Sequence, residues 1–151
     1  MPTLVERLSE DLKSALKGRD EFRVGVLRMM IAKVKDLQIE QGRATPLTDE
    51  QVVGVLATYA KQRQEAADTF AQAGRADRSD QELREREVVR AYLPEQLDDD
   101  AVRAVLREII AQAGAVSARD LGKIMGPAMA RLKGKADGAR VQALGRELLG
   151  G

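Results

Sequence analysis

The sequence predicts an all-α fold of about seven helices arranged in two helical subdomains. Helix-favouring Ala, Leu, Arg, Glu and Gln are abundant, whereas aromatic residues make up only 3% of the 151 residues. No stretch alternates apolar and polar residues in the way that a half-buried strand does. A chain of this length can bury about 70% of the surface that it exposes when unfolded, so independent folding is expected.

Four helices are predicted in the first part of the chain. Capping boxes mark three of their starts, because a Ser or Thr hydroxyl accepts a hydrogen bond from an early backbone N–H while the side chain three residues later reaches back. The helix over 21–41 carries apolar residues on more than one face, which predicts that it is the central helix. The predicted ranges are 4–17, 21–41, 49–73 and 80–92, and the boxes pair Thr3 with Glu6, Thr48 with Gln51 and Ser79 with Glu82.

Three further helices are predicted in the last third of the chain. The first opens at Asp98-Asp99-Asp100, whose carboxylates suit the positive end of a helix dipole. The second begins after Ser117, which fits a capping box with Asp120, and Pro127 predicts a kink or break within this helix. The third begins after Asp137.

Glycines and prolines divide these helices from one another. Four glycines are placed where a left-handed residue ends a helix, namely Gly18, Gly42, Gly74 and Gly114. The strongest boundary is the segment Tyr92-Leu93-Pro94-Glu95-Gln96-Leu97, because the residue before a proline avoids helical geometry. We therefore expect an N-terminal helical domain over 1–92, a linker over 93–97 and a C-terminal helical domain over 98–151.

Missing residue types exclude several classes of chemistry. Cys, His and Trp are absent. The chain therefore has no disulfide, no thiolate nucleophile or thiolate metal site, and no imidazole base or ligand. There is also no Gly-rich phosphate loop and no Gly-x-Ser-x-Gly elbow. We expect no catalytic residue, no metal site and no cofactor.

The start of the chain and its hydropathy predict a cytoplasmic protein. No run of about 18 apolar residues exists that could span a membrane. The first seven residues lack the basic and then apolar order of a signal peptide. No association with a membrane is expected.

Positive charge is concentrated near the end of the chain. The 25 basic and 24 acidic residues nearly cancel, but residues 119–151 hold seven basic and three acidic side chains. A local basic patch could bind phosphates, and a solvated turn is the alternative interpretation. The candidate nucleic-acid-binding residues are Lys123, Arg131, Lys133, Lys135 and Arg140. Between them, Gly134 is expected to end one helix and Asp137 to cap the next.

Small residues recur every four positions beside this patch. They are Ala118, Gly122, Gly126 and Ala130, which would lie on one face of a helix. The favoured interpretation is tight packing against a neighbouring helix. The alternative is an exposed stripe that admits a nucleic-acid backbone or a partner helix, with Gly122, Gly126 and Gly134 allowing close approach.

A second charged cluster lies in the helix over 49–73. Glu65 and Asp68 share one face and could in principle bind magnesium or act as acid and base. A surface ion network that includes Lys61 and Arg63 is the favoured interpretation, because exposed helix charges usually form such networks.

Seven segments follow one another in order along nearly the whole chain. They are Leu27-Arg28 with Ala32, Lys33 and Lys35; Arg63-x-Glu65-Ala66-x-x-x-Phe70; Ala73-Gly74-Arg75-x-Asp77; Tyr92-Leu93-Pro94-x-Gln96-Leu97; Gly114-Ala115; Gly122-Lys123-x-Met125-Gly126; and Leu132-Lys133-Gly134-Lys135-Ala136-Asp137-Gly138. Together these segments resemble the GatB/YqeY family of small bacterial proteins. The resemblance implies a two-part helical fold whose C-terminal part is similar to the tail domain of the B subunit of the aspartyl/glutamyl-tRNA amidotransferase, which helps to hold the transfer RNA. Family members carry the label of carbon–nitrogen ligase with glutamine as amide donor, but the catalytic parts of that enzyme have no counterpart in these residues.

Three hypotheses for function follow. The first is a non-catalytic accessory protein that binds transfer RNA through the basic C-terminal hairpin. The second is a helical module for protein–protein interaction without RNA contact, and the third, least favoured, is a stand-alone amide-forming enzyme. Expected partners are transfer RNA, amidotransferase subunits or an aminoacyl-tRNA synthetase, and the sequence leaves the oligomeric state open.

Overall fold

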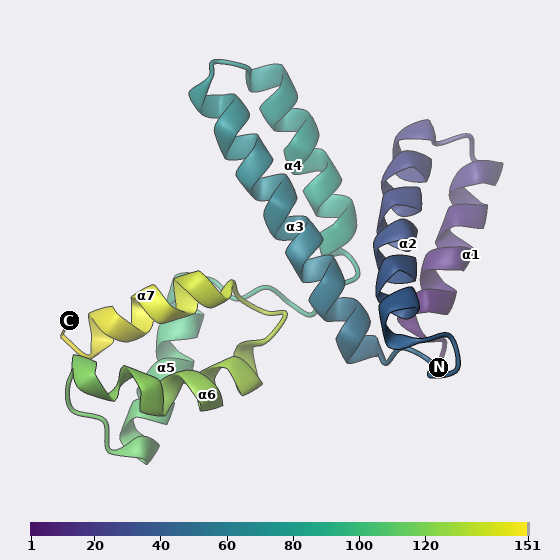
Figure 1. Cartoon of the computed structure of the whole chain (residues 1–151). Coiled ribbons are helices and arrows are strands. Elements are labelled where there is room, and N and C mark those ends of the chain that lie inside the picture. Colours follow the sequence, from purple (N-terminus) through teal and green to yellow (C-terminus); the bar gives the residue numbers. More distant parts are fainter. Residues whose placement is uncertain (151) are drawn as a thin grey trace. The chain divides into compact units, whose positions relative to one another are not determined.

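The computed structural model describes residues 1–150, and these residues form seven α-helices and one short 3₁₀ helix without any strand, which confirms the all-α prediction (Figure 1). The chain divides into two compact units, Met1–Leu93 (unit 1) and Pro94–Gly151 (unit 2). The elements are α1 (Leu4–Lys17), α2 (Glu21–Gln41), α3 (Asp49–Gln72), α4 (Ala76–Arg90), α5 (Asp99–Ala113), η1 (Ala118–Asp120), α6 (Leu121–Leu132) and α7 (Gly138–Leu148).

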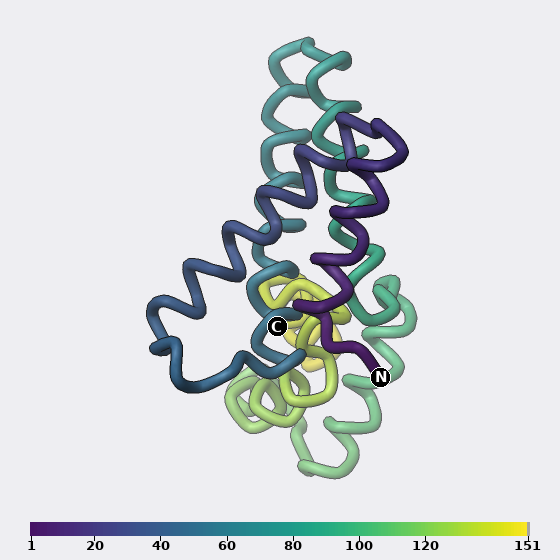
Figure 2. The backbone as a smooth tube through the Cα atoms, turned by 90° about the vertical axis from the view of Figure 1, so that its right-hand side faces the viewer, coloured from purple at the N-terminus to yellow at the C-terminus, as the bar shows by residue number. Residues whose placement is uncertain are grey.

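Unit 1 consists of two helical hairpins, α1–α2 and α3–α4. Figures 1 and 2 show α3 and α4 running side by side in opposite directions. Helix α2 packs against each of the other three helices of the unit, as expected for the central helix. Its second apolar face is not covered, since Met29 is 49% exposed. The buried core comprises Leu8, Ala15, Val26, Leu27, Met30, Val34, Val52, Leu56, Tyr59, Ala60, Val89 and Tyr92.

Helix α4 begins earlier than the sequence predicts. The predicted cap at Ser79 is wrong, because α4 starts at Ala76, with Arg75 as its N-cap after the left-handed Gly74. Ser79 lies inside the helix and is only 8% exposed. A small hydroxyl side chain suits this buried position, and the Ser-x-x-Glu pattern there is not a capping box.

A polar network joins the two helices of the α3–α4 hairpin. The Arg63 guanidinium lies 2.9 Å from the Glu82 carboxylate, 3.9 Å from that of Glu85 and 5.2 Å from the centre of the Tyr59 ring. These groups are largely shielded from water, and Arg63 Nε is buried without a hydrogen-bond partner. Burial and the neighbouring Glu82 carboxylate raise the pKa of Glu85. In this network one cation, Arg63, lies between two carboxylates of α4.

The turn that ends α1 also differs from the prediction. Gly18 keeps a right-handed helical conformation (φ −80°), and Arg19 takes the left-handed one (φ 55°). The Asp20 N–H donates to the Ala15 carbonyl and the Arg19 N–H to the Leu16 carbonyl, which is a Schellman ending. Its left-handed position, usually occupied by Gly, is here occupied by Arg19. The glycine pattern predicts this turn one residue too early.

Replacing Arg19 by Gly is expected to stabilise unit 1 by about 1 kcal/mol, because a Cβ is disfavoured in the left-handed region. Thermal or urea unfolding of the full chain measures this gain. The matched control is Arg19→Ala, which removes the same guanidinium but keeps the backbone penalty and should give no gain. Equal stability of the two variants would contradict this explanation.

Unit 2 is a three-helix unit with a core of aliphatic and Met side chains. Helix α6 continues through Pro127, so the predicted break is wrong. Gly145 of α7 allows close packing on α6, because a Cβ at this position would lie 3.2 Å from Leu121. The buried core comprises Val102, Leu106, Ile109, Ala115, Ile124, Ala128, Leu132, Val141, Leu144 and Leu149.

The segment between α4 and α5 is anchored at both ends. Tyr92 is buried in unit 1, where its hydroxyl donates to Asp11 of α1 and the Arg7 guanidinium covers its ring at 4.4 Å. Burial and the Asp11 carboxylate raise the pKa of Tyr92 well above its usual range. Leu97 packs into the core of unit 2. The two anchors are only five positions apart in the sequence.

Candidate nucleic-acid interface

The basic turn Lys133-Gly134-Lys135 joins α6 to α7. Helix α6 ends at Leu132, the Lys133 N–H donates to the Met129 carbonyl at 3.0 Å, and the Lys135 N–H donates to the Leu132 carbonyl at 2.8 Å. Gly134 has a φ of 78°, where a side chain would be strained. The backbone N–H groups of the turn therefore bond to the last turn of α6, and both lysine side chains are exposed.

The segment before α5 fixes this turn from outside. The Gln96 side-chain amide donates to the Gly134 carbonyl at 2.6 Å and to the Pro94 carbonyl at 2.9 Å. The Leu97 N–H donates to the Lys135 carbonyl at 2.9 Å. These contacts connect positions almost 40 residues apart, and the residue pattern alone did not indicate them. Gln96 and Leu97 thus position the basic turn.

Lys133 and Lys135 form no ion pair within the described part of the chain, and both side chains are exposed. Each ammonium is thus free to meet a phosphate.

The other three candidate cations are paired with acids. Lys123 lies 3.2 Å from Asp120, and the other two pairs join Arg131 to Glu108 of α5 at 2.9 Å and Arg140 to Asp99 of α5 at 2.5 Å. All three cations are about half exposed or more, and exposed pairs contribute about 0–1 kcal/mol each.

Two of these acids have shifted pKa values. The hydrogen bond from Arg140 lowers the pKa of Asp99. The Val116 N–H, followed by Lys123, lowers the pKa of Asp120. Both carboxylates are thus held in the charged form, and their cations are partly neutralised.

The acids of α5 reduce the basic character that residues 119–151 suggest. Over 94–151 the sequence holds nine basic and eight acidic side chains, so unit 2 as a whole is nearly neutral. The run Asp98-Asp99-Asp100 indicates in the sequence that unit 2 is nearly neutral. These three acids form the start of α5, which packs against α6 and α7. The surplus of positive charge is therefore local to the α6–α7 turn.

The stripe of small residues on η1 and α6 does not pack against another helix of unit 2. Ala118, Gly122, Gly126 and Ala130 are all exposed. A Cβ on Gly122 or Gly126 would have no neighbour within 4 Å. The packing interpretation is therefore wrong, and these two glycines leave a smooth exposed face on α6.

The acidic pair on α3 does not assemble a metal site. Asp68 accepts a hydrogen bond from the Gln64 amide at 2.9 Å, and Arg63 pairs with the acids of α4 rather than with Glu65. Over residues 1–150, no three acidic side chains come close enough together to hold a metal ion. Of the ion network expected on α3, Arg63 forms its ion pairs with Glu82 and Glu85 of α4 instead of with Glu65 or Asp68.

No helix within residues 1–150 has both the length and the apolar character that a bilayer crossing requires.

Comparison with known proteins gives one family and one relative. A family described as "Yqey-like protein" matches residues 5–149. A protein of Eremothecium gossypii, "Altered inheritance of mitochondria protein 41, mitochondrial", is 29% identical over 86 residues, which are 57% of this chain and 46% of that protein. The chain thus aligns with about half the length of this relative.

Proposed function

The chain belongs to the YqeY-like family, and from this premise we propose that it is a non-catalytic accessory protein related to tRNA-dependent amidotransferases that binds transfer RNA. The observation that carries the proposal is the turn with Lys133 and Lys135, which form no ion pair among residues 1–150 and whose backbone is held by Gln96. The proposal includes a similarity of unit 2 to the tail domain of the amidotransferase B subunit.

The two lysines would contact phosphates and hold the RNA without reading its sequence. Lysine is a point charge that accepts many phosphate geometries, so selectivity would come from the shape of the RNA. Arg131 and Arg140 would add contacts, because a phosphate can replace the exposed carboxylates of Glu108 and Asp99. The smooth face at Gly122 and Gly126 would allow a nucleic-acid backbone to approach α6.

The absence of intrinsic catalysis in this proposal rests on the residue types present. Without Cys or His, the usual nucleophiles and bases of amide chemistry are missing. An assay of glutamine- and ATP-dependent amidation of Glu-tRNA tests this directly. Turnover by this chain alone would contradict it.

The double variant Lys133→Glu/Lys135→Glu is expected to bind transfer RNA at least about tenfold more weakly, because two phosphate contacts become repulsive. Fluorescence anisotropy with labelled transfer RNA measures this at several salt concentrations. In the milder variant Lys133→Ala/Lys135→Ala, the slope of log K against log salt should become shallower by about 2. Unfolding stability should change by less than about 0.5 kcal/mol, since both side chains are exposed.

The chain offers a matched control with the same spacing, Lys33→Glu/Lys35→Glu on α2. It changes the net charge equally but leaves the turn intact, so RNA affinity should stay close to that of the wild type. A third variant, Gln96→Ala, keeps every cation and should weaken binding by loosening the turn. If the two charge-reversed variants lose the same RNA affinity, the net charge of the chain explains the loss, and the proposed site is contradicted.

A further inference from the structure

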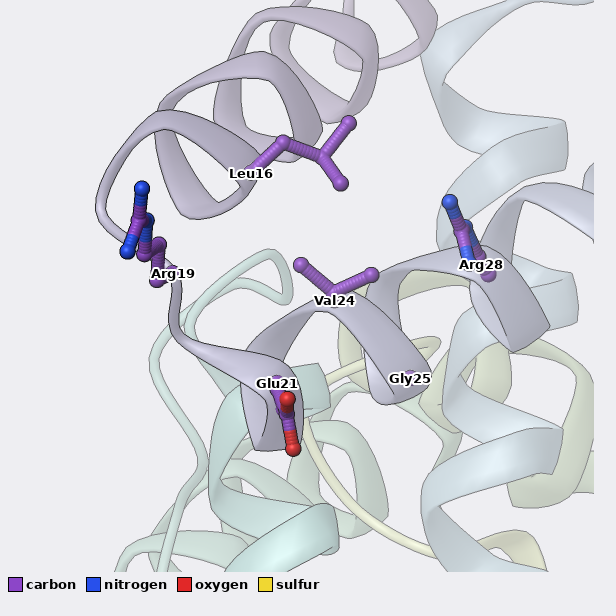
Figure 3. A pocket seen from close by; sticks show the side chains of 6 residues that line it. All are labelled: Leu16, Arg19, Glu21, Val24, Gly25 and Arg28. Carbon is purple, nitrogen blue, oxygen red and sulfur yellow. The ribbon is translucent and has the colours of Figure 1, made fainter.

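A shallow cavity of about 430 Å³ lies where α1 turns into α2 in unit 1. Figure 3 shows Leu16 of α1 and Val24 of α2 reaching toward each other, with Arg19 on one side and Arg28 on the other. Gly25 adds no side chain to fill the space, since a Cβ there would have no neighbour within 4 Å. We call this feature the α1–α2 cavity; its lining residues are Leu16, Arg19, Glu21, Val24, Gly25 and Arg28.

The floor of the α1–α2 cavity is apolar and open to water. Leu16 is 47% exposed, and Met29, one helical turn beyond Gly25, is 49% exposed. Met29 is not among the lining residues, so the apolar surface of the cavity is formed by Leu16 and the half-buried Val24. Such a surface gains free energy when an apolar side chain of a partner covers it.

The rim of the α1–α2 cavity is positive. Neither Arg19 nor Arg28 forms an ion pair among residues 1–150, and both are exposed. Figure 3 shows the one acid of the lining, Glu21, directed away from the space between Leu16 and Val24. Residues 16–28 hold four basic and two acidic side chains. The charge therefore favours an acidic occupant.

Arg19 is kept on this rim at a cost to the backbone. Its left-handed conformation (φ 55°) is one that Gly would adopt without strain. An arginine in that position lowers the stability of the fold but places a guanidinium on the same cavity as Leu16. Such strain is expected where a side chain serves a purpose other than folding.

We propose that the α1–α2 cavity docks an acidic amphipathic helix of a partner protein. An apolar side chain of that helix enters between Leu16 and Val24, and flanking carboxylates pair with Arg19 and Arg28. An open cavity built by a single hairpin does not enclose a small molecule, and a phosphate chain would pair with the two arginines but leave Leu16 and Val24 uncovered. The proposal stands apart from RNA binding, because it uses unit 1 and none of the residues of the α6–α7 turn.

The test is a nuclear magnetic resonance titration of the full chain, labelled with ¹⁵N, against two synthetic helical peptides. The first carries Leu along one face and Glu on both flanks, and the second replaces every Glu by Lys. We expect saturable shifts of the amides of Leu16, Val24 and Met29 with the acidic peptide and none with the basic one. Arg28→Glu should weaken binding at least about tenfold, and the exposed Arg78→Glu on α4 is the matched control that should not.

Two further variants separate docking from folding. Arg19→Gly and Arg19→Ala should both weaken peptide binding, although only the former relieves the backbone, so a loss of fold cannot explain the result. The inference is overturned if both peptides bind alike, if Arg28→Glu and Arg78→Glu behave alike, or if the acidic peptide shifts other amides instead. It is also overturned if vesicles of phosphatidylglycerol and phosphatidylcholine shift the same amides while the acidic peptide does not.

Discussion

Replacing Leu106 by Ala is expected to lower the free energy of unfolding of unit 2 by about 3 kcal/mol. Leu106 of α5 is 0% exposed and lies in the core formed with α6 and α7. A buried Leu→Ala change removes transfer free energy and leaves a cavity, which together cost about 2–5 kcal/mol. A unit of under 60 residues has little stability in reserve, so this loss should unfold much of it. Urea denaturation and amide hydrogen exchange over α5–α7 measure the effect.

The control for Leu106→Ala is Leu16→Ala on α1, where about half of the side chain is already exposed. That change should cost less than about 1 kcal/mol. Because the α6–α7 turn depends on the fold of unit 2, Leu106→Ala should also abolish RNA binding that requires Lys133 and Lys135. Retained protection of the α5–α7 amides in Leu106→Ala would show that this core tolerates a cavity and would contradict the expected marginal stability.

Replacing Arg63 by Met is expected to destabilise the α3–α4 hairpin by about 2 kcal/mol at pH 7. The change keeps much of the side-chain volume but leaves Glu82 and Glu85 facing each other without a cation. Removing one partner of a shielded ion pair costs more than the pair contributes, because the remaining charge stays desolvated. The stacking of Arg63 over Tyr59 is lost as well. Thermal unfolding of the full chain measures the loss.

The cost of Arg63→Met should fall as the pH is lowered. The pKa of Glu85 is already raised in the folded chain above its ordinary value of 4.5, mainly by burial and then by Glu82. A carboxyl with a raised folded pKa binds a proton that the unfolded chain has released, so its contribution to stability is complete below the unfolded pKa and is lost as pH rises through the folded pKa. Without Arg63, whose charge lowers this pKa, the pH dependence should be steeper than in the wild type.

The double variant Arg63→Met/Glu85→Gln separates repulsion from lost packing. It removes one of the two facing carboxylates, so it should recover much of the stability at pH 7 and show a flatter pH dependence than Arg63→Met. If both variants lose the same stability at every pH, the carboxylates of Glu82 and Glu85 do not govern this hairpin.

Local signals in the sequence predict most of the helices. Thr48 and Gln51 form the full reciprocal capping box, and Asp98 caps α5 by accepting from the Ala101 N–H at 2.8 Å. Such caps depend on a few adjacent residues, so they can be read directly. The errors arise where packing overrides a local pattern: Ser79 is a buried helical residue, and Arg19 rather than Gly18 takes the left-handed position.

Whether each candidate cation is paired with an acid could not be predicted from its neighbours in the sequence. Arg131 meets Glu108 and Arg140 meets Asp99 only because α5 packs against α6 and α7. These partners are 23 and 41 residues away in the sequence, and a charge count over the last 33 residues omits them. Lys133 and Lys135 remain candidates because neither forms an ion pair among residues 1–150.

The composition of the two cores has an optical consequence. All four aromatic residues, Phe22, Tyr59, Phe70 and Tyr92, belong to unit 1, and the chain has no Trp. Tyrosine emission and near-ultraviolet dichroism therefore report on unit 1 alone, whereas far-ultraviolet dichroism sums the helices of both units. A single Trp introduced at an exposed site of α7, such as Gln142, would give unit 2 a chromophore of its own.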